Sequence, residues 1–244
     1  MKRVPIYSRS QVTRFVLFLV ARVGSTYLTS VLNSHSKVIA LGEEVRDLEE
    51  SGAGAQLNWT KEFLTPPVFG RNSARGFNVK LVHLVDPAAF AQMLHDNQCK
   101  IIHLDRQNRV KAVVSRLNGR RLYKKTGMWG LFEESNRPPP FEIDPQEFDD
   151  LLKHREKVDR ELAAYVGSLE LPTLSLLYED MLKNEESFLS EIFTFLNVEP
   201  EPTAGSTKKI TSDNLRDIVV NFDEIKSRYA GSVYEPMFDE VIIP

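Results

Sequence analysis

The sequence predicts a three-layer α/β/α fold, in which helices cover both faces of a central, mostly parallel β-sheet. Short runs of β-branched and aromatic residues alternate with longer amphipathic runs along most of the chain. Such alternation favours parallel strands joined by crossover helices. The 244 residues, 42% of them hydrophobic, are enough for one well-buried core. We therefore predict a single domain over 1–244, with 199–244 as a helical tail packed on the core.

The elements are expected as follows. Strands are predicted at Thr13–Val20, Val38–Leu41, Gly76–Val82, Lys100–Leu104 and Thr173–Leu177. Helical spacing of apolar residues predicts helices at Thr26–Ser34, Pro87–Asp96, Arg109–Arg120, Pro145–Ser168 and Glu185–Asn197. In the tail, the apolar residues from Leu215 to Ile225 predict one further helix.

Two stretches, 45–75 and 123–145, break this alternation with clusters of Gly and Pro. We predict long surface segments at both places. The second also carries Trp129, Phe132 and Phe141, a composition that suits a lid or an acceptor-binding loop. A poorly ordered insertion is the alternative for that segment.

Composition excludes several classes of protein. The formal net charge of −3 provides no general attraction to nucleic acid or to an anionic membrane, so any anion site must be local. The single cysteine, Cys99, excludes an intrachain disulfide and suits a reducing compartment. The first apolar run is about half as long as a membrane span, and no secretory signal precedes it. We expect a cytoplasmic protein without stable membrane insertion or nucleic-acid partner and, because no His/Cys/Asp cluster has metal-ligand spacing, without a metal.

The most informative motif lies where the first strand ends. Shortly after the apolar run 15–20 come Arg22, Val23, Gly24, Ser25, Thr26 and Tyr27. Gly24 lets the backbone approach an anion, and the unpaired N–H groups of the next helix point toward it. Ser25 and Thr26 can cap that helix or donate to phosphate oxygens, and Arg22 adds charged donors. The loop lacks the Lys of G-x-x-x-x-G-K-[ST], which argues against a Mg-ATP kinase or a GTPase.

A second basic turn follows the strand predicted at 100–104. There Asp105 and Arg106 precede a helix that carries Arg109 and Ser115. Ligands of open α/β folds bind at the carboxyl edge of the sheet. The two basic, hydroxyl-bearing turns are therefore expected together at this ligand-binding edge.

Together the two turns resemble motifs of the sulfotransferases that use 3′-phosphoadenosine 5′-phosphosulfate (PAPS), in particular bacterial and carbohydrate-type members with a P-loop-like α/β fold. Residues 22–28 are similar to the family's 5′-phosphosulfate loop. Residues 104–115 are similar to its 3′-phosphate motif, which implies that Arg106 and Ser115 hold the 3′-phosphate. The separation of these two is one residue longer than is commonest in the family, so Arg109 is an alternative to Arg106. Asp105 is unusual beside a phosphate.

The resemblance extends along most of the chain. It includes a Gly-Glu turn that ends at Glu43, a Gly-Phe-x-x-Lys strand that ends at Lys80, and a C-terminal signature that begins with Lys208 and Lys209. It implies that Glu43 is the general base for the acceptor hydroxyl. It also implies that Arg22 binds the 5′-phosphosulfate, that Lys80 stabilises the bridging oxygen, and that the two tail lysines close over the nucleotide. For all three lysines, an ammonium that is merely solvated at the surface is the alternative.

Other residues compete for these roles. Glu44 competes with Glu43, since neighbouring residues on an extended segment face opposite ways and only one should reach the site. His35 is a rival base, although its place at the end of the first helix favours a helix-terminating role. His83 and His103 lie in apolar sequence and are interpreted as structural histidines.

The resemblance implies in-line transfer of a sulfuryl group from PAPS to a hydroxyl of a small-molecule, lipid or carbohydrate acceptor, with adenosine 3′,5′-bisphosphate (PAP) as the product. Two alternatives stay open. The first is a P-loop-like nucleotide or metabolite kinase, which would need the missing Lys. The second is a non-catalytic nucleotide-binding module of the same fold. The acceptor and the oligomeric state are also open at this point.

Overall fold

The central element of the structure is a five-stranded sheet, and all of its strands are parallel. The computed structural model describes residues 7–8, 12–67, 69–70 and 72–242. The strand order is β3-β5-β2-β6-β7. These strands are β2 (Thr13–Leu19), β3 (Val38–Leu41), β5 (Ala74–Val79), β6 (Lys100–Asp105) and β7 (Thr173–Leu177). A separate antiparallel pair joins β1 (Tyr7–Ser8) to β4 (Phe69–Gly70).

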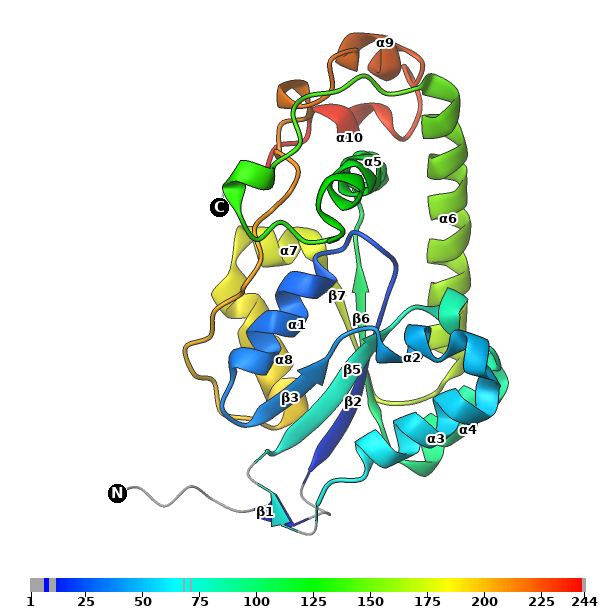
Figure 1. The fold of residues 1–244 in the computed structure, drawn as a ribbon, viewed down its shortest axis with the longest axis vertical. Coiled ribbons are helices and arrows are strands. Elements are labelled where there is room, and N and C mark those ends of the chain that lie inside the picture. Colours follow the sequence, from blue (N-terminus) through cyan, green and yellow to red (C-terminus); the bar gives the residue numbers. More distant parts are fainter. Residues whose placement is uncertain (1–6, 9–11, 68, 71, 243–244) are drawn as a thin grey trace.

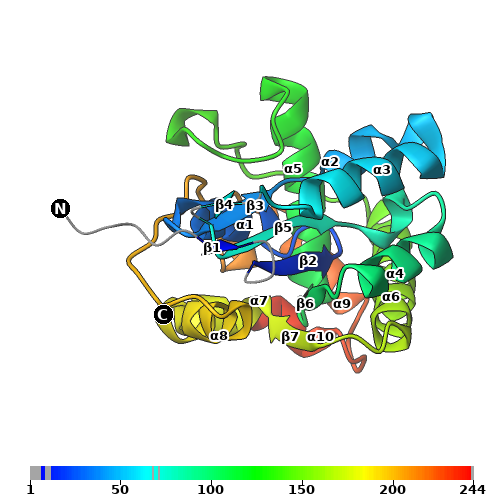
Figure 2. The same ribbon diagram turned by 90° about the horizontal axis from the view of Figure 1, so that it is seen from below.

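Helices cover both faces of the sheet, which confirms the predicted fold class (Figures 1 and 2). One face carries α1 (Ser25–Ser34), α7 (Tyr178–Lys183) and α8 (Glu185–Leu196), and the other carries α3 (Gly52–Leu64), α4 (Pro87–Asp96) and α6 (Pro145–Ser168). The remaining helices are α2 (Glu44–Asp47), α5 (Arg109–Thr126), α9 (Phe222–Ser227) and α10 (Glu235–Asp239). Short 3₁₀ turns are η2 (Glu49–Ser51), η3 (Leu81–His83), η4 (Glu134–Asn136) and η5 (Leu215–Asp217). None of the helices in the described ranges has the length and apolar character needed to cross a membrane.

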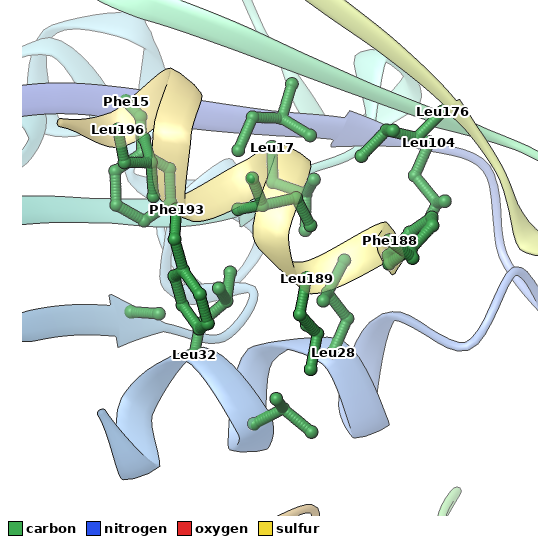
Figure 3. Close-up of a cluster of buried hydrophobic side chains, with 14 of the residues drawn as sticks. Phe15, Leu17, Leu28, Leu32, Leu104, Leu176, Phe188, Leu189, Phe193 and Leu196 are labelled. Atoms are coloured by element: carbon green, nitrogen blue, oxygen red, sulfur yellow. The ribbon is translucent and has the colours of Figure 1, made fainter. Parts of the chain in front are cut away.

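Two hydrophobic cores lie on opposite faces of the sheet. Phe15 and Leu17 of β2 pack against α1 and α8 (Figure 3). Val16 and Phe18, which alternate with them, face the cluster formed with α3, α4 and α6. All four side chains are almost fully buried. Because side chains of a strand alternate between faces, a central strand covered on both sides must be apolar throughout. This requirement explains the unbroken apolar run that precedes the loop.

Side-chain caps define where α4 and α6 begin, and the sequence predicted the bounds of both helices correctly. The predictions Pro87–Asp96 and Pro145–Ser168 match α4 and α6. Asp86 accepts a hydrogen bond from the N–H of Ala89 (2.9 Å), and Asp144 accepts one from the N–H of Glu147 (2.8 Å). Such N-cap contacts satisfy donors that the first helical turn leaves unpaired. A proline at the first helical position adds to this start signal.

The prediction of a long surface segment over 45–75 is wrong, because α2, η2 and α3 occupy much of it. Gln56 of α3 is buried, and its amide donates to the carbonyl oxygens of Val45 (2.9 Å) and His83 (2.7 Å). Trp59 packs edge-on against Phe77 of β5. These tertiary contacts stabilise a helix despite its two glycines.

The strand predicted at 76–82 begins and ends earlier than expected: β5 spans Ala74–Val79, and η3 follows it.

The helix predicted from Leu215 to Ile225 is broken into η5 and α9, and α10 follows beyond the predicted range. Before them, residues 198–212 cross the surface without regular structure, and we name this segment the strap (Figure 1). The segment predicted as a loop at 123–145 begins as the last turn of α5 and ends where α6 starts. Between these helices it is ordered against the C-terminal part of the chain, through bridges from Leu131 to Lys208 and from Phe141 to Val219.

Candidate active site

The turn between β2 and α1 has an unusual backbone. Gly24 has a φ of 79° and Arg22 a φ of 71°, both in the left-handed region. A Cβ atom at Gly24 would also lie 2.9 Å from the ring of Tyr178, so only glycine fits. Helix α1 begins at Ser25 without a side-chain cap. The N–H groups of its first turn therefore lack helical partners and can donate to an anion.

Two buried arginines hold the carbonyl groups of this turn. Arg106 Nη1 donates to the carbonyl oxygen of Arg22 (3.0 Å), and Arg155 Nη1 donates to that of Ala21 (2.8 Å). Both arginine side chains are about 6% exposed. The carbonyl oxygens at 21 and 22 are thus occupied by protein donors.

The side chain of Arg22 reaches the second predicted motif. Its Nε donates to Ser115 Oγ (3.1 Å), and its Nη1 lies 3.4 Å from the carbonyl oxygen of Trp129. Burial, and to a smaller extent the nearby Arg106, lower the pKa of Arg22 to about 10. Arg22 stays protonated at neutral pH, but its charge is poorly compensated by the protein. An anion placed beside it would be strongly favoured.

These groups border a cavity of about 410 Å³ at the carboxyl edge of the sheet. Predicted residues that line it are Arg22, Gly24, Ser25, Thr26, Tyr27, Arg106, Ser115, Lys208 and Lys209. Apolar and aromatic residues form another part of the wall, among them Trp129, Tyr178, Met181 and Leu182. The remaining predicted loop residue, Val23, has a fully buried side chain in the core and does not line the cavity.

The structure shows which of the two candidate arginines, Arg106 or Arg109, lines the cavity. Arg106 lines the cavity, with its guanidinium 4.5 Å above the ring of Tyr178, and its buried Nε has no hydrogen-bond partner among the described residues. Arg109 turns to α6 instead, where its Nε donates to Asp159 (3.2 Å). Asp105 does not face the cavity either: its carboxylate accepts from the N–H of Arg106 (2.7 Å) and lies 3.7 Å from Arg155.

Glu179 is a site residue that sequence reasoning missed. Its buried carboxylate accepts hydrogen bonds from the N–H groups of Gln107 and Asn108, both at 3.1 Å, and lies 4.0 Å from Arg106. It therefore fixes the turn between β6 and α5. A signal was present, because Glu179 and Tyr178 directly follow β7, at the same edge of the parallel sheet.

The strap covers one side of the cavity. The N–H of Lys208 donates to the carbonyl oxygen of Leu131 (2.8 Å), which joins the strap to the segment after α5. Both tail lysines are exposed. Lys209 Nζ donates to Asp213 (2.7 Å), a carboxylate that also accepts from Lys111 (3.0 Å). The ammonium of Lys208 has no ion-pair partner among the described residues.

Glu43 and Lys80 form an ion pair at neighbouring strand ends, since Glu43 follows β3 and Lys80 follows β5. Lys80 Nζ lies 2.6 Å from both carboxylate oxygens. Neither residue lines the cavity described above. Arg46 is a second cation near the carboxylate of Glu43, at 3.6 Å. Glu44 opens α2 and is exposed, so it is not on an extended segment as predicted.

None of the three histidines considered from the sequence lines the cavity. His35 caps the far end of α1, where its buried ring contacts the carbonyl oxygen of Glu199 (3.0 Å) and accepts from the N–H of Lys37 (3.1 Å). The helix-terminating interpretation of His35 is confirmed. His83 is partly exposed beside Glu49 (3.0 Å), so it is not a core residue. His103 lies in β6, where burial lowers its pKa.

The single cysteine does not take part in the site. Cys99 is buried at the start of β6, and burial raises the pKa of its thiol to about 12, which removes thiolate chemistry at neutral pH.

Tyr123 and Trp129 stack with ring centroids 4.7 Å apart, and each is 45% exposed. They form an exposed aromatic surface beside the cavity. The described residues contain no group of three or more His, Cys, Asp or Glu side chains placed to hold a metal ion.

The fold and this site define a class: an α/β protein with a parallel sheet and a glycine-containing strand-to-helix turn that borders a cavity at the carboxyl edge. No protein-family model matches the chain. The chain is 22% identical to nodulation protein H of Rhizobium tropici over 254 aligned positions, which cover 96% of each chain. The crystal structure of a sulfotransferase from Alicyclobacillus acidocaldarius superimposes with a TM-score of 0.50 and 18% identity, over 93% of this chain and 96% of that one. A mouse sulfotransferase, SULT7A1, solved in complex with PAP, gives a TM-score of 0.48 at 16% identity, over 94% of this chain and 69% of that one.

The resemblance predicted from the sequence is thus confirmed at the level of the fold, which the chain shares with the Alicyclobacillus sulfotransferase.

Proposed function

We propose that the protein is a sulfotransferase that transfers a sulfuryl group from PAPS to an acceptor hydroxyl. One observation carries this proposal: the two predicted anion motifs, on separate turns of the chain, meet in one cavity, where Arg22 donates to Ser115. The cavity volume of about 410 Å³ lies in the range of small-ligand pockets. The likeness in fold to the Alicyclobacillus sulfotransferase supports the same conclusion.

The cavity suits a nucleotide with two phosphate groups. The loop and the first N–H groups of α1 would hold the 5′-phosphosulfate, with Arg22 as its main cation. Arg106 and Ser115 would hold the 3′-phosphate, and the unpartnered Nε of Arg106 is a buried donor that such an anion could satisfy. The aromatic and apolar part of the wall, which includes Tyr178 and Trp129, would receive the base. When bound, PAPS supplies an activated sulfuryl group.

In the reaction, the acceptor oxygen forms a bond to sulfur while the bond from sulfur to the 5′-phosphate oxygen breaks, which leaves PAP. The acceptor proton must leave at the same time, and Glu43 is our proposed base. Because Lys80 now occupies both oxygens of Glu43, this ion pair must loosen before the carboxylate can take a proton. A released Lys80 could then stabilise the leaving oxygen.

The acceptor is proposed to be a small molecule, a lipid or a carbohydrate. The stacked pair of Tyr123 and Trp129 provides an exposed aromatic face, on which a sugar or an apolar ring can pack. A cytoplasmic location remains part of the proposal, and it favours a metabolite or a biosynthetic intermediate as the acceptor.

Calorimetric titration of the purified protein with PAP and with ATP tests this proposal. We expect PAP to bind more tightly than ATP without added Mg²⁺, because the loop lacks the P-loop lysine and the site offers two separate phosphate positions. Arg106→Gln should weaken binding of PAP by about ten- to hundredfold, whereas Arg109→Gln should change it less than about threefold. Tight binding of ATP but not of PAP would support the kinase alternative instead.

The base assignment has its own test. Glu43→Gln should lower turnover on a responsive acceptor by about 10²–10⁴-fold, the usual contribution of general acid–base catalysis, with little change in PAP affinity. Glu44→Gln is the matched control and should be nearly as active as the unmodified protein. Turnover should be measured on a panel of phenols, sugars and lipid hydroxyls. If Glu44→Gln alone abolished transfer, the base would be Glu44.

A further inference from the structure

An arginine of α6 contacts the turn between β2 and α1, which we name the donor loop, although this arginine lies far from both anion motifs in the sequence. Arg155 is about 6% exposed. Its Nη1 donates to the carbonyl oxygen of Ala21 (2.8 Å), the residue just before Arg22. No predicted motif includes Arg155, and it does not line the cavity. Arg155 can therefore affect a bound nucleotide only through the loop, and not by touching the nucleotide itself.

Arg155 is itself held in place by a carboxylate. Its Nε lies 2.7 Å from one oxygen of Asp159 and 2.9 Å from the other. The same carboxylate accepts from Arg109 at the start of α5 (3.2 Å). Asp159 thus joins the guanidinium groups of α5 and α6, and both its side chain and that of Arg155 are nearly inaccessible to solvent. A buried ion pair with this geometry fixes the orientation of its members.

The loop needs such support because of its backbone. Arg22 adopts a left-handed φ of 71°, which costs a residue with a side chain about 1 kcal/mol or more unless its surroundings enforce it. Arg106 holds the carbonyl of Arg22, and Arg155 holds the carbonyl of Ala21. With both oxygens engaged on the protein side, the peptide groups of the turn cannot easily rotate a carbonyl toward a bound anion.

We propose that Arg155 is a positioning residue for the donor loop: through the carbonyl of Ala21 it holds the turn in the conformation that binds the 5′-phosphate end of the nucleotide. This inference rests on the proposed function. It assigns Arg155 no contact with the nucleotide. Its effect should therefore be confined to ligands that carry a 5′-phosphate, which separates it from a general role in packing α6.

The test compares two nucleotides. PAP carries both phosphates, whereas adenosine 3′-monophosphate lacks the 5′-phosphate that the loop would bind. For Arg155→Met we expect an affinity for PAP that is about ten- to hundredfold lower, because one charged hydrogen bond is lost and the partly buried carbonyl of Ala21 is left unpaired. The affinity for adenosine 3′-monophosphate should change by less than about twofold. Calorimetry below the melting temperature measures both.

Three further variants complete the experiment. Arg155→Lys keeps the charge and one donor, and should restore part of the PAP affinity. Asp159→Asn leaves Arg155 in place without its carboxylate, and should show a smaller loss that is again selective for PAP; it also serves if Arg155→Met folds poorly. Arg160→Met, at an exposed position of α6, is the matched control and should bind both nucleotides normally.

The possible outcomes are distinct. An equal loss for both nucleotides, or a lower melting temperature with unchanged PAP affinity in Arg155→Met and Asp159→Asn, would show a purely structural role and overturn the inference. If PAP bound normally to every variant, the proposed function would stand without a positioning role for Arg155. If the unmodified protein did not bind PAP, the proposed function itself would fail, and the inference with it.

Discussion

At the scale of single residues, Arg22 combines two unfavourable features in one position. Its backbone is left-handed, and its cation is desolvated next to another cation, Arg106. Among the described residues, no carboxylate lies within ion-pair distance of its guanidinium. Buried charges are normally paired, so an unpaired one is costly in the free protein. This combination is typical of a site organised for a ligand and against its own stability.

The first residue-scale prediction follows from this conflict. Arg22→Gln should lower the affinity for PAP by at least about tenfold, because the main cation of the loop is lost. The same change should raise the melting temperature by about 2–4 °C for each ~1 kcal/mol of relieved desolvation. Calorimetry and thermal unfolding without ligand measure the two effects. A variant that bound PAP normally, or that was clearly less stable, would contradict this account.

Some residues of the site could be predicted from the sequence and others could not. Gly24 and Arg106 stand at strand ends, a position that a pattern of strands and turns reveals. The choice between Arg106 and Arg109 depended on Asp159, which lies fifty residues further along the chain than Arg109. The contact of Arg155 with the loop could not be predicted for the same reason. Its role follows from the packing of α6 against the loop, which local sequence does not encode.

At the scale of elements, the contact between β2 and β5 leaves no room for a side chain at Gly76. A Cβ atom there would lie 2.3 Å from the carbonyl oxygen of Phe15 and 2.5 Å from its ring. Neither atom can move freely, since Phe15 lies in the core and in the parallel ladder. This close approach, and not the flexibility of glycine, explains why the strand carries Gly76.

We therefore predict that Gly76→Ala destabilises the protein by about 1–3 kcal/mol or more, the usual cost of overpacking. Gly167→Ala is a matched control in α6, where an added Cβ would meet nothing within 4 Å. That change should stabilise the protein by about 0.5–1 kcal/mol, because alanine favours the helix. Chemical denaturation measures both. Equal stabilities of the two variants would show that the sheet can adjust at Gly76.

Elements with strong local signals were predicted well, whereas those held by distant contacts were not. Helices α4 and α6 have both an N-cap and a proline, and their bounds match the predictions. Helix α3 was missed because its glycines suggested a loop, while its stabilising contacts come from Gln56 and Trp59 to other parts of the chain. The tail helix was predicted as continuous, since its apolar spacing alone does not show where the helix breaks.

At the scale of the whole molecule, the strap links the C-terminal part of the chain to α1 and to the segment after α5. The N–H groups of Ala204 and Ser206 each donate to a serine of α1, Ser34 and Ser30, at 3.0 Å. Lys208 pairs with Leu131 in an antiparallel bridge. These contacts join residues up to 176 positions apart in the chain. No local pattern reveals them, which is why the sequence showed the lysines but not the strap.

Gly205 is the point where the strap packs against Tyr27 of α1. A Cβ atom there would lie 2.0 Å from the ring of Tyr27, which lines the cavity and donates to Glu185 (2.6 Å). Gly205→Ala should therefore push the strap or the ring away. We expect the affinity for PAP to fall by about tenfold, the equivalent of ~1.4 kcal/mol, with little change in the melting temperature, because Gly205 lies outside both cores of the sheet.

Limited trypsin digestion tests the same displacement directly, since Lys208 and Lys209 are exposed cleavage sites on the strap. PAP should slow cleavage there in the unmodified protein. In Gly205→Ala the cleavage should be faster, and PAP should protect less. Gly54→Ala, at an uncrowded position of α3, is the control and should behave like the unmodified protein. If Gly205→Ala kept both its PAP affinity and its protection, the strap would not contribute to nucleotide binding, and the predicted role of the two lysines would fall with it.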